Sequence, residues 1–220
     1  MKTKVKRGKF ITIEGGEGSG KSTQISILVN RLQEEGVSAV KTREPGGAPT
    51  SDAIRSLLVS GEISFWEPIS ETMLHFAARH EHIIKTINPS LDKGLWVISD
   101  RFSDSTMAYQ GYGQGVSKSI IDSLYTITAD NIEPDLTLIL DLEPEVGLKR
   151  AVDRNVSLSS NEDRYERMDI EFHRKLRKGF LDIAKNNPTR CRVIKAQGSL
   201  DDVSVRVWKE VSQKFLIKDI

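Results

Sequence analysis

One glycine-rich stretch near the start of the chain constrains the fold more than any other feature. Residues 15–22 read GGEGSGKS, which fits the phosphate-loop pattern G-x-x-x-x-G-K-[ST]. Residues 9–14 (KFITIE) have the composition of a buried strand, and residues 25–32 place apolar side chains at helical spacing. A strand, a glycine loop and a helix in this order bring backbone N–H groups and a helix dipole to a phosphate. The pattern predicts a nucleoside triphosphate site.

The last two residues of this loop indicate how the triphosphate is held. Lys21 can reach the β- and γ-phosphates, and the hydroxyl of Ser22 can ligate Mg²⁺, which is the expected metal. The residues expected to bind ATP are Gly15, Gly16, Glu17, Gly18, Ser19, Gly20, Lys21 and Ser22.

Composition excludes several other classes of protein. The 220 residues carry a net charge of +1, which argues against a non-specific nucleic-acid binder and against an anionic-membrane anchor. No apolar run approaches the roughly 18 residues of a membrane span. A single cysteine, Cys191, allows no internal disulfide and favours a reducing compartment, for which we expect the cytoplasm. Without repeats or a low-complexity linker, we expect one domain over residues 1–220.

Strand patterns alternate with helix patterns along the whole chain. Strands are expected at 9–14, 37–42, 95–99, 136–140 and 192–195. One long helix, with Ile69, Met73 and Phe76 on its apolar side, is expected to stop before Pro89, and a short helix is expected over 146–152. These elements predict an α/β fold, a five-stranded parallel sheet with helices on both faces. In such a fold ligands bind at the carboxyl ends of the strands.

Charged residues follow the predicted strands at that edge. Arg43 ends the second strand, where it could fork a phosphate or belong to an ordinary surface turn. Asp100 and Arg101 end the third strand, and an acid there, beside a phosphate loop, is expected to ligate Mg²⁺. Asp141 competes for that role, but the sequence after it favours a part in starting the next helix. We therefore assign the metal to Ser22 and Asp100.

Three histidines between positions 75 and 82 could suggest a zinc site. His75, His80 and His82 are five and two residues apart, which does not give the i, i+4 pair of a helical zinc site. We expect them to lie at the surface.

Five segments in a fixed order resemble the bacterial thymidylate kinase family. They are FITIEG with the phosphate loop (10–22), REPGG (43–47), FAAR (76–79), DRF (100–102) and STMAYQ (105–110). The resemblance extends from about residue 10 to residue 215, and REPGG with AYQ is much more specific than the loop. It implies the P-loop nucleoside monophosphate kinase fold. It also implies transfer of the γ-phosphate of ATP to dTMP, with Mg²⁺, giving dTDP and ADP for DNA synthesis.

The resemblance assigns roles at the phosphate and sugar. Glu17 matches the loop acid near the sugar 3′-hydroxyl, and Arg43 and Arg101 match the arginines that hold the dTMP phosphate and bridge to ATP. Lys21 and Arg101 are then catalytic. Phe102 is a departure, because the family usually has Tyr or His there, and it removes a polar group from the edge of the site.

The resemblance also assigns the residues around the base. Phe76 resembles the aromatic that stacks on thymine and Arg79 the arginine that donates to its O4. Spacing alone supports this pair, since i and i+3 share a helix face, although packing in the core would explain Phe76 equally. The remaining expected contacts, from the STMAYQ segment, are Ser105, Thr106 at the base N3, and Tyr109 and Gln110 around sugar and base.

Residues 154–167 resemble the family's mobile lid over ATP. Members without a basic residue inside the phosphate loop carry arginines in the lid, and here Arg154, Arg164 and Arg167 are present. Arg154, and after it Arg164, are the expected transition-state arginines; a disordered loop is the alternative.

Two other classes of function stay open at this point. A different nucleotide or nucleoside kinase would share the fold, but a nucleoside kinase needs a carboxylate base for the sugar hydroxyl. A non-catalytic ATP-dependent switch would not need paired arginines. The family is generally a homodimer packed through helices, and apolar positions between 69 and 87 could form that interface or belong to the core.

Overall fold

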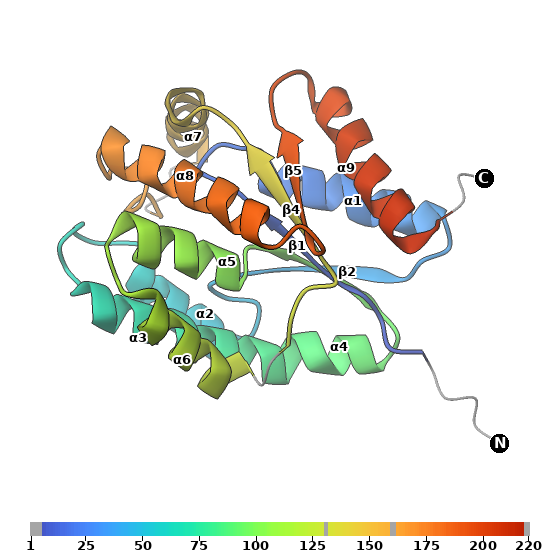
Figure 1. Ribbon diagram of the computed structural model, residues 1–220, viewed down its shortest axis with the longest axis horizontal. Helices are drawn as coiled ribbons and strands as arrows, with labels where there is room; N and C mark the ends of the chain where they lie inside the picture. Colours follow the sequence, from blue (N-terminus) through green and yellow to red (C-terminus); the bar gives the residue numbers. More distant parts are fainter. Residues whose placement is uncertain (1–5, 130–131, 159–161, 218–220) are drawn as a thin grey trace.

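Five parallel strands form the centre of the molecule, in the order β2-β3-β1-β4-β5 (Figure 1). The computed structural model describes residues 6–129, 132–158 and 162–217, with side chains described for all of these except residues 154–158. The strands are β1 (Phe10–Glu14), β2 (Ala39–Arg43), β3 (Trp96–Asp100), β4 (Leu136–Asp141) and β5 (Cys191–Lys195). The predicted α/β fold with a five-stranded parallel sheet is therefore confirmed.

Helices cover both faces of this sheet. The helices are α1 (Lys21–Glu34), α2 (Pro49–Leu58), α3 (Pro68–His82), α4 (Asn88–Asp92), α5 (Ser103–Thr106), α6 (Lys118–Ala129), α7 (Pro144–Leu158), α8 (Ile170–Asn186) and α9 (Leu200–Phe215). Two π-helical segments, Ile83–Ile87 and Met107–Gly113, connect α3 to α4 and extend α5. Figure 1 shows α1 and α9 on one side of the sheet and α8, α5 and α3 on the other.

The central strand is apolar because it is covered on both faces. All five residues of β1 are buried, and Ile11 and Ile13 face the core under α1 and α9. Phe10, on the opposite face, packs edge-on against Phe102 at 5.0 Å between ring centroids. The strand ends at the phosphate loop, so this core fixes where the loop begins.

The register of the strands aligns the charged residues at one edge. Asp100 is paired with both Ile13 of β1 and Arg43 of β2. Arg101 follows at a φ of 71°, a left-handed conformation that is costly for a bulky side chain and is typical of functional sites. Its N–H donates to the Ile13 carbonyl at 3.1 Å, which holds this conformation in place.

The region around Pro89 differs from the prediction. The helical path does not stop before Pro89 but continues through the π-helical segment into α4, whose first turn contains the proline. The π-helical segment directly before Pro89 changes the hydrogen-bond pattern from i→i+4 to i→i+5, so the chain can stay helical past a residue that has no N–H. The apolar side also differs, because Ile69 and Met73 are about half exposed while Phe76 is buried.

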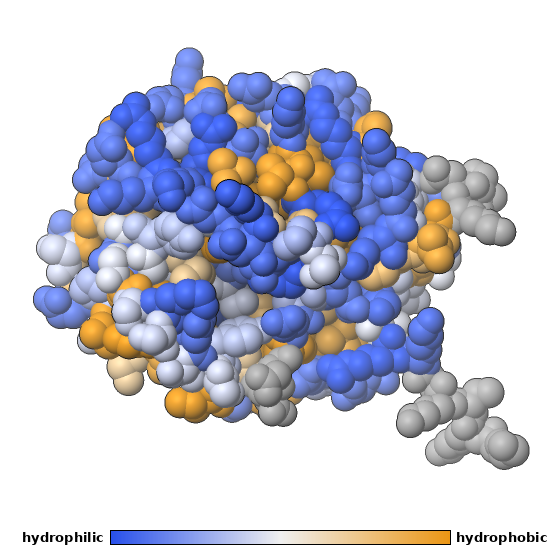
Figure 2. Space-filling view, in the orientation of Figure 1, coloured by the Kyte–Doolittle hydropathy of each residue, from blue (hydrophilic) through white to orange (hydrophobic). Residues whose placement is uncertain are grey.

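The predicted short helix at 146–152 is longer than expected. Helix α7 continues to Leu158, so the first part of the expected lid, including Arg154, has a helical backbone. Residues 159–161 lie outside the described residues. Within the described part of the chain, no helix is long and apolar enough to cross a membrane, and the face drawn in Figure 2 is largely hydrophilic.

Candidate active site

The phosphate loop is held by its own lysine. Gly15, Gly18 and Gly20 have positive φ values of 137°, 63° and 92°, which glycine adopts without a Cβ clash. Lys21 Nζ donates to the carbonyls of Gly15 and Gly16 at 3.1 and 2.8 Å. Burial, together with the charge of Arg101, lowers the pKa of Lys21 to about 8. The ammonium group therefore lies inside the loop, where a bound phosphate would compete with the two carbonyls for its hydrogen bonds.

A hydroxyl and a carboxylate meet beside this lysine. Ser22 Oγ donates to Asp100 Oδ2 at 2.6 Å, and both residues line the main cavity. Such oxygen ligands fit Mg²⁺, which proteins bind through one or two carboxylates plus phosphate oxygens. Among the described residues there is no cluster of three His, Cys, Asp or Glu side chains that could hold a metal alone.

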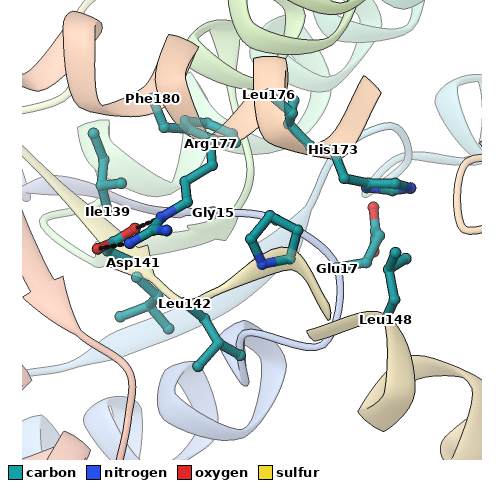
Figure 3. A pocket seen from close by; sticks show the side chains of 13 residues that line it. Gly15, Glu17, Ile139, Asp141, Leu142, Leu148, His173, Leu176, Arg177 and Phe180 are labelled. Atoms are coloured by element: carbon teal, nitrogen blue, oxygen red, sulfur yellow. Dashed lines mark hydrogen bonds and ion pairs between the residues drawn. The ribbon is translucent and has the colours of Figure 1, made fainter. Parts of the chain in front are cut away.

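The competing acid, Asp141, is engaged elsewhere. Its two carboxylate oxygens accept from Arg177 of α8 at 2.7 and 3.1 Å, as Figure 3 shows at the end of β4. This ion pair lies against a small cavity of about 20 Å³ behind the phosphate loop. The interpretation of Asp141 as a helix-starting residue was wrong, because its side chain binds α8 instead.

A cavity of about 490 Å³ runs from the phosphate loop to helix α3. This volume is within the usual range for small-molecule sites. The predicted residues that line it are Glu17, Gly18, Gly20, Lys21, Ser22, Arg43, Arg79, Asp100, Arg101, Ser105, Thr106, Tyr109 and Gln110. Gly15, Gly16 and Ser19 complete the loop without lining this cavity.

Arg101 and Glu17 form an ion pair at the centre of the cavity. Arg101 donates to Glu17 Oε1 at 2.9 Å and to the Gly15 carbonyl at 2.9 Å, and the Tyr109 hydroxyl donates to the same Glu17 oxygen at 2.5 Å. Burial would raise the pKa of Glu17, but the charges of Arg101 and Lys21 outweigh it and lower that pKa to about 2. Glu17 is therefore an anion at neutral pH.

Arg43 lies at the mouth of the cavity, more exposed than Arg101. Its guanidinium is 3.8 Å from Asp52, and both side chains are about half exposed. A pair of this kind contributes little to stability, so Arg43 is available to an incoming anion.

Arg79 is fixed at the other end of the cavity by a buried acid. Its Nε donates to Glu44 Oε2 at 2.8 Å, and His82 Nδ1 lies 2.9 Å from Glu44 Oε1. Burial raises the pKa of Glu44, but the charge of Arg79 and the hydrogen bonds from His82 and Arg79 together outweigh burial, so the pKa is lowered. The prediction of surface histidines was wrong for His82, which is fully buried, and for His75, which lines the cavity.

Phe76 does not line the cavity. Its ring is 1% exposed and packs against Val116 and Ile121. The Arg79 guanidinium lies over it, 4.8 Å from the ring centroid. Phe76 therefore supports Arg79 from the core side, and its direct stacking on a base stays a prediction.

Arg164 is not a free lid arginine. It is 1% exposed, donates to the Leu58, Glu62 and Ile63 carbonyls, and forms an ion pair with Glu71. A guanidinium with these partners cannot reach a phosphate at the loop, so its assignment as a transition-state residue was wrong. Arg154 lies in α7, and its side chain is outside the described residues.

Comparison with known proteins identifies the family. The family model for thymidylate kinase matches residues 13–207. The chain belongs to the thymidylate kinase family. It is 47% identical to the thymidylate kinase of Nitrobacter winogradskyi over 97% of this chain and 92% of that protein. It is 44% identical to the thymidylate kinase of Magnetococcus marinus over 96% of this chain and 99% of that protein. A crystal structure of the Ehrlichia chaffeensis thymidylate kinase superimposes with a TM-score of 0.75, at 39% identity over 94% of this chain and 99% of that one.

In this thymidylate kinase-family cavity several lining residues were not predicted. Arg55 of α2 donates to the Pro45 carbonyl at 2.8 Å and pairs with Glu162 at 2.6 Å. Tyr165 contributes a buried hydroxyl. These residues could not be predicted as part of the cavity, because the sequence around them has no motif that distinguishes them from ordinary polar residues.

Proposed function

We propose that this protein transfers the γ-phosphate of ATP to dTMP, giving dTDP and ADP. One observation carries the proposal. A single cavity has the phosphate loop with Lys21 and Ser22 at one end and the buried donor Arg79 beside Gln110 at the other. Two substrates can therefore meet inside one enclosed space, which is the main requirement of phosphoryl transfer.

The cationic groups of the cavity suit an acceptor that is already a phosphate. Arg101 and Arg43 line the same cavity as Lys21 and Arg79. A phosphate acceptor needs orientation and charge neutralisation, but no strong general base. Glu17, ionised and bound to Arg101 and Tyr109, would orient Arg101 and accept from a sugar hydroxyl.

Ser22 and Asp100 would hold Mg²⁺. When bound, the metal would neutralise charge on the β- and γ-phosphates. The chain's own contribution is to keep the hydroxyl and the carboxylate together at the end of β3, next to Lys21.

The lid would span residues 154–167 of the single domain formed by residues 1–220. Arg154 is the proposed transition-state arginine, since Arg164 is engaged by Glu71. Glu162, paired with Arg55 at the cavity mouth, would hold the far part of the lid near α2.

Two wider properties complete the proposal. A homodimer packed through α3 and α6 is supported by the exposed Ile69 and Met73 on α3 and the 76% exposed Ile127 on α6. Cytoplasmic location is supported by the single cysteine, Cys191, which cannot form an internal disulfide.

The proposal is tested by a two-substrate assay. ADP formation is measured with ATP and each deoxynucleoside monophosphate, and with thymidine, with Lys21→Ala as the inactive control. We expect dTMP to give by far the highest kcat/KM. Preference for thymidine would indicate a nucleoside kinase, and ATP binding without any transfer would indicate a switch.

A further inference from the structure

Glu71 on α3 is a fully buried carboxylate with four hydrogen-bond donors around it. Oε1 accepts from Gln110 Nε2 at 2.7 Å, from Gln114 Nε2 at 2.8 Å and from the Tyr165 hydroxyl at 3.0 Å, while Oε2 accepts from Arg164. These partners come from two segments outside α3, residues 110–114 and residues 164–165.

The ionised form of Glu71 is favoured by its partner Arg164. Burial alone would raise the pKa of Glu71, but the hydrogen bond and the charge of Arg164, together with the hydrogen bond from Gln110, contribute to lowering it. An ionised carboxylate only accepts hydrogen bonds. Every group that faces Glu71 must therefore present an N–H or O–H to it.

This requirement fixes the side-chain amide of Gln110. Its NH₂ group is committed to Glu71, so its carbonyl oxygen is the edge that remains. Gln110 lines the cavity, is 1% exposed, and its Oε1 is buried without a hydrogen-bond partner. The Gln110 side chain thus holds a fixed, unpaired acceptor at the wall of the cavity.

The neighbouring polar groups define the rest of the pattern. Arg79 Nη1 is a buried donor without a partner, while its other nitrogens bind Glu44, Phe102 and Thr106. The Thr106 hydroxyl accepts from Arg79 and can rotate, so it does not by itself distinguish a donor from an acceptor on the ligand. The cavity end therefore offers one fixed donor, from Arg79, and one fixed acceptor, from Gln110.

We propose that Glu71, held by Arg164, is a specificity-determining positioning residue: it orients the Gln110 amide so that the site requires a base with a hydrogen-bond donor on its ring nitrogen. The inference rests on the proposed function and names how that site chooses among pyrimidines. Thymine and uracil carry N3–H beside the acceptor O4, which matches the pattern. Cytosine carries an acceptor at N3 beside a 4-amino donor, which opposes it at both points.

Replacement of Glu71 by its amide gives a directional test. In Glu71→Gln, Arg164 still requires an acceptor at its own position, so the new side chain must turn its NH₂ toward Gln110. Gln110 must then accept from it and present its own NH₂ to the cavity. We expect the ratio of kcat/KM for dTMP to that for dCMP to fall by about 10–100-fold, the scale of one reversed base contact. The dTMP to dUMP ratio should stay within about twofold, since these bases share the same edge.

Matched variants separate orientation from loosened packing. Gln110→Met removes the acceptor and should also lower the dTMP to dCMP ratio. Gln114→Met removes an equivalent amide that binds Glu71 but does not line the cavity, and should leave both ratios within about twofold. Thermal unfolding and the KM for ATP are measured for every variant. If Glu71→Gln does not fold, the double variant Glu71→Gln with Arg164→Met removes both buried charges together. Without Arg164 the new amide can keep its carbonyl toward Gln110, so the dTMP to dCMP ratio of the double variant should stay within about twofold of wild type.

Three results would overturn the inference. The first is an unchanged dTMP to dCMP ratio in folded Glu71→Gln, or an equally large fall of that ratio in the folded double variant that lacks Arg164. The second is an unchanged ratio in Gln110→Met, and the third is an equal fall in the dCMP and dUMP comparisons, as a merely structural role would give. Failure of the proposed function itself is recognised separately, because the wild-type protein would then not phosphorylate dTMP.

Discussion

At the scale of single residues, the two strand-end acids differ in what they bind, and this difference supports the proposed metal site at Asp100. Asp100 accepts from Ser22 at 2.6 Å, whereas Asp141 is held by both nitrogens of the Arg177 fork. Asp100→Asn is expected to raise the Mg²⁺ concentration for half-maximal activity by at least about tenfold, since a charged ligand is lost. Asp141→Asn is expected to leave it unchanged and to cost only about 1 kcal/mol of stability. Activity is measured as a function of Mg²⁺ concentration at fixed ATP. A larger increase in the Mg²⁺ requirement for Asp141→Asn than for Asp100→Asn would assign the metal to the end of β4 instead.

Phe76 acts through the residue it supports. Phe76→Ala is expected to cost roughly 3–5 kcal/mol of unfolding free energy, because the ring is buried among Val116 and Ile121. It should also weaken use of dTMP by about 0.5–2 kcal/mol, the size of one cation–π contact, as Arg79 loses the ring beneath it. The KM for ATP should hardly change. If the kinetic parameters for ATP and dTMP worsen equally, measured below the melting temperature of the variant, Phe76 has only a packing role.

At the scale of structural elements, two of the three arginines in the proposed lid have different expected effects. Arg154→Ala is expected to lower kcat by a factor of roughly 10³–10⁵, the range for a transition-state arginine. The Kd for dTMP, titrated without ATP, should stay within a few-fold. A collapse of dTMP binding, or an unchanged kcat, would leave the developing charge to Lys21, Arg101 and Mg²⁺.

Arg164→Ala is expected to behave as a stability variant. Removing it leaves Glu71 buried without its cation, which typically costs about 3–5 kcal/mol. The fall in melting temperature should be far larger than for Arg167→Ala, an exposed control in the same segment. If Arg164→Ala instead lowers kcat as much as Arg154→Ala does, without lowering the melting temperature, Arg164 would have to be interpreted as a transition-state arginine.

The elements that the sequence predicted well are those with strong local signals. The phosphate loop, β1 and α1 combine glycine spacing with unbroken apolar patterns, and all three are found as predicted. Pro89 misled the prediction because a π-helical segment before it lets the chain stay helical. Arg164 misled it because a polar sequence around an arginine does not disclose a buried partner 93 residues away. Long-range pairing of this kind has no local signature.

At the scale of the whole molecule, exposed apolar side chains on neighbouring helices indicate an interface. Ile69 and Met73 of α3 and Ile127 of α6 are 50%, 55% and 76% exposed, and α3 contacts α6. Apolar surface is visible over this region in Figure 2. The double variant Ile69→Glu with Met73→Glu is expected to sediment as a monomer at micromolar concentration, where the wild-type protein is expected to be a dimer. The dimer of the variant would have to bury two carboxylates in an apolar interface, which is costly.

Val205→Glu is the matched control for this experiment. Val205 is 61% exposed on α9, on the other side of the sheet, and its substitution should leave the sedimentation coefficient unchanged. A wild-type protein that sediments as a monomer would contradict the homodimer.

Two ion pairs that join the described residues 162–167 to other parts of the chain differ in burial, and this has a consequence for turnover. Arg164 and Glu71 are at most 1% exposed, whereas Glu162 is 45% exposed where it meets Arg55 at the cavity mouth. Salt screens the second pair and hardly affects the first. Added salt should therefore release only the mouth contact and speed the departure of dTDP and ADP, so ionic strength would adjust product residence time while the base end of the cavity keeps its shape.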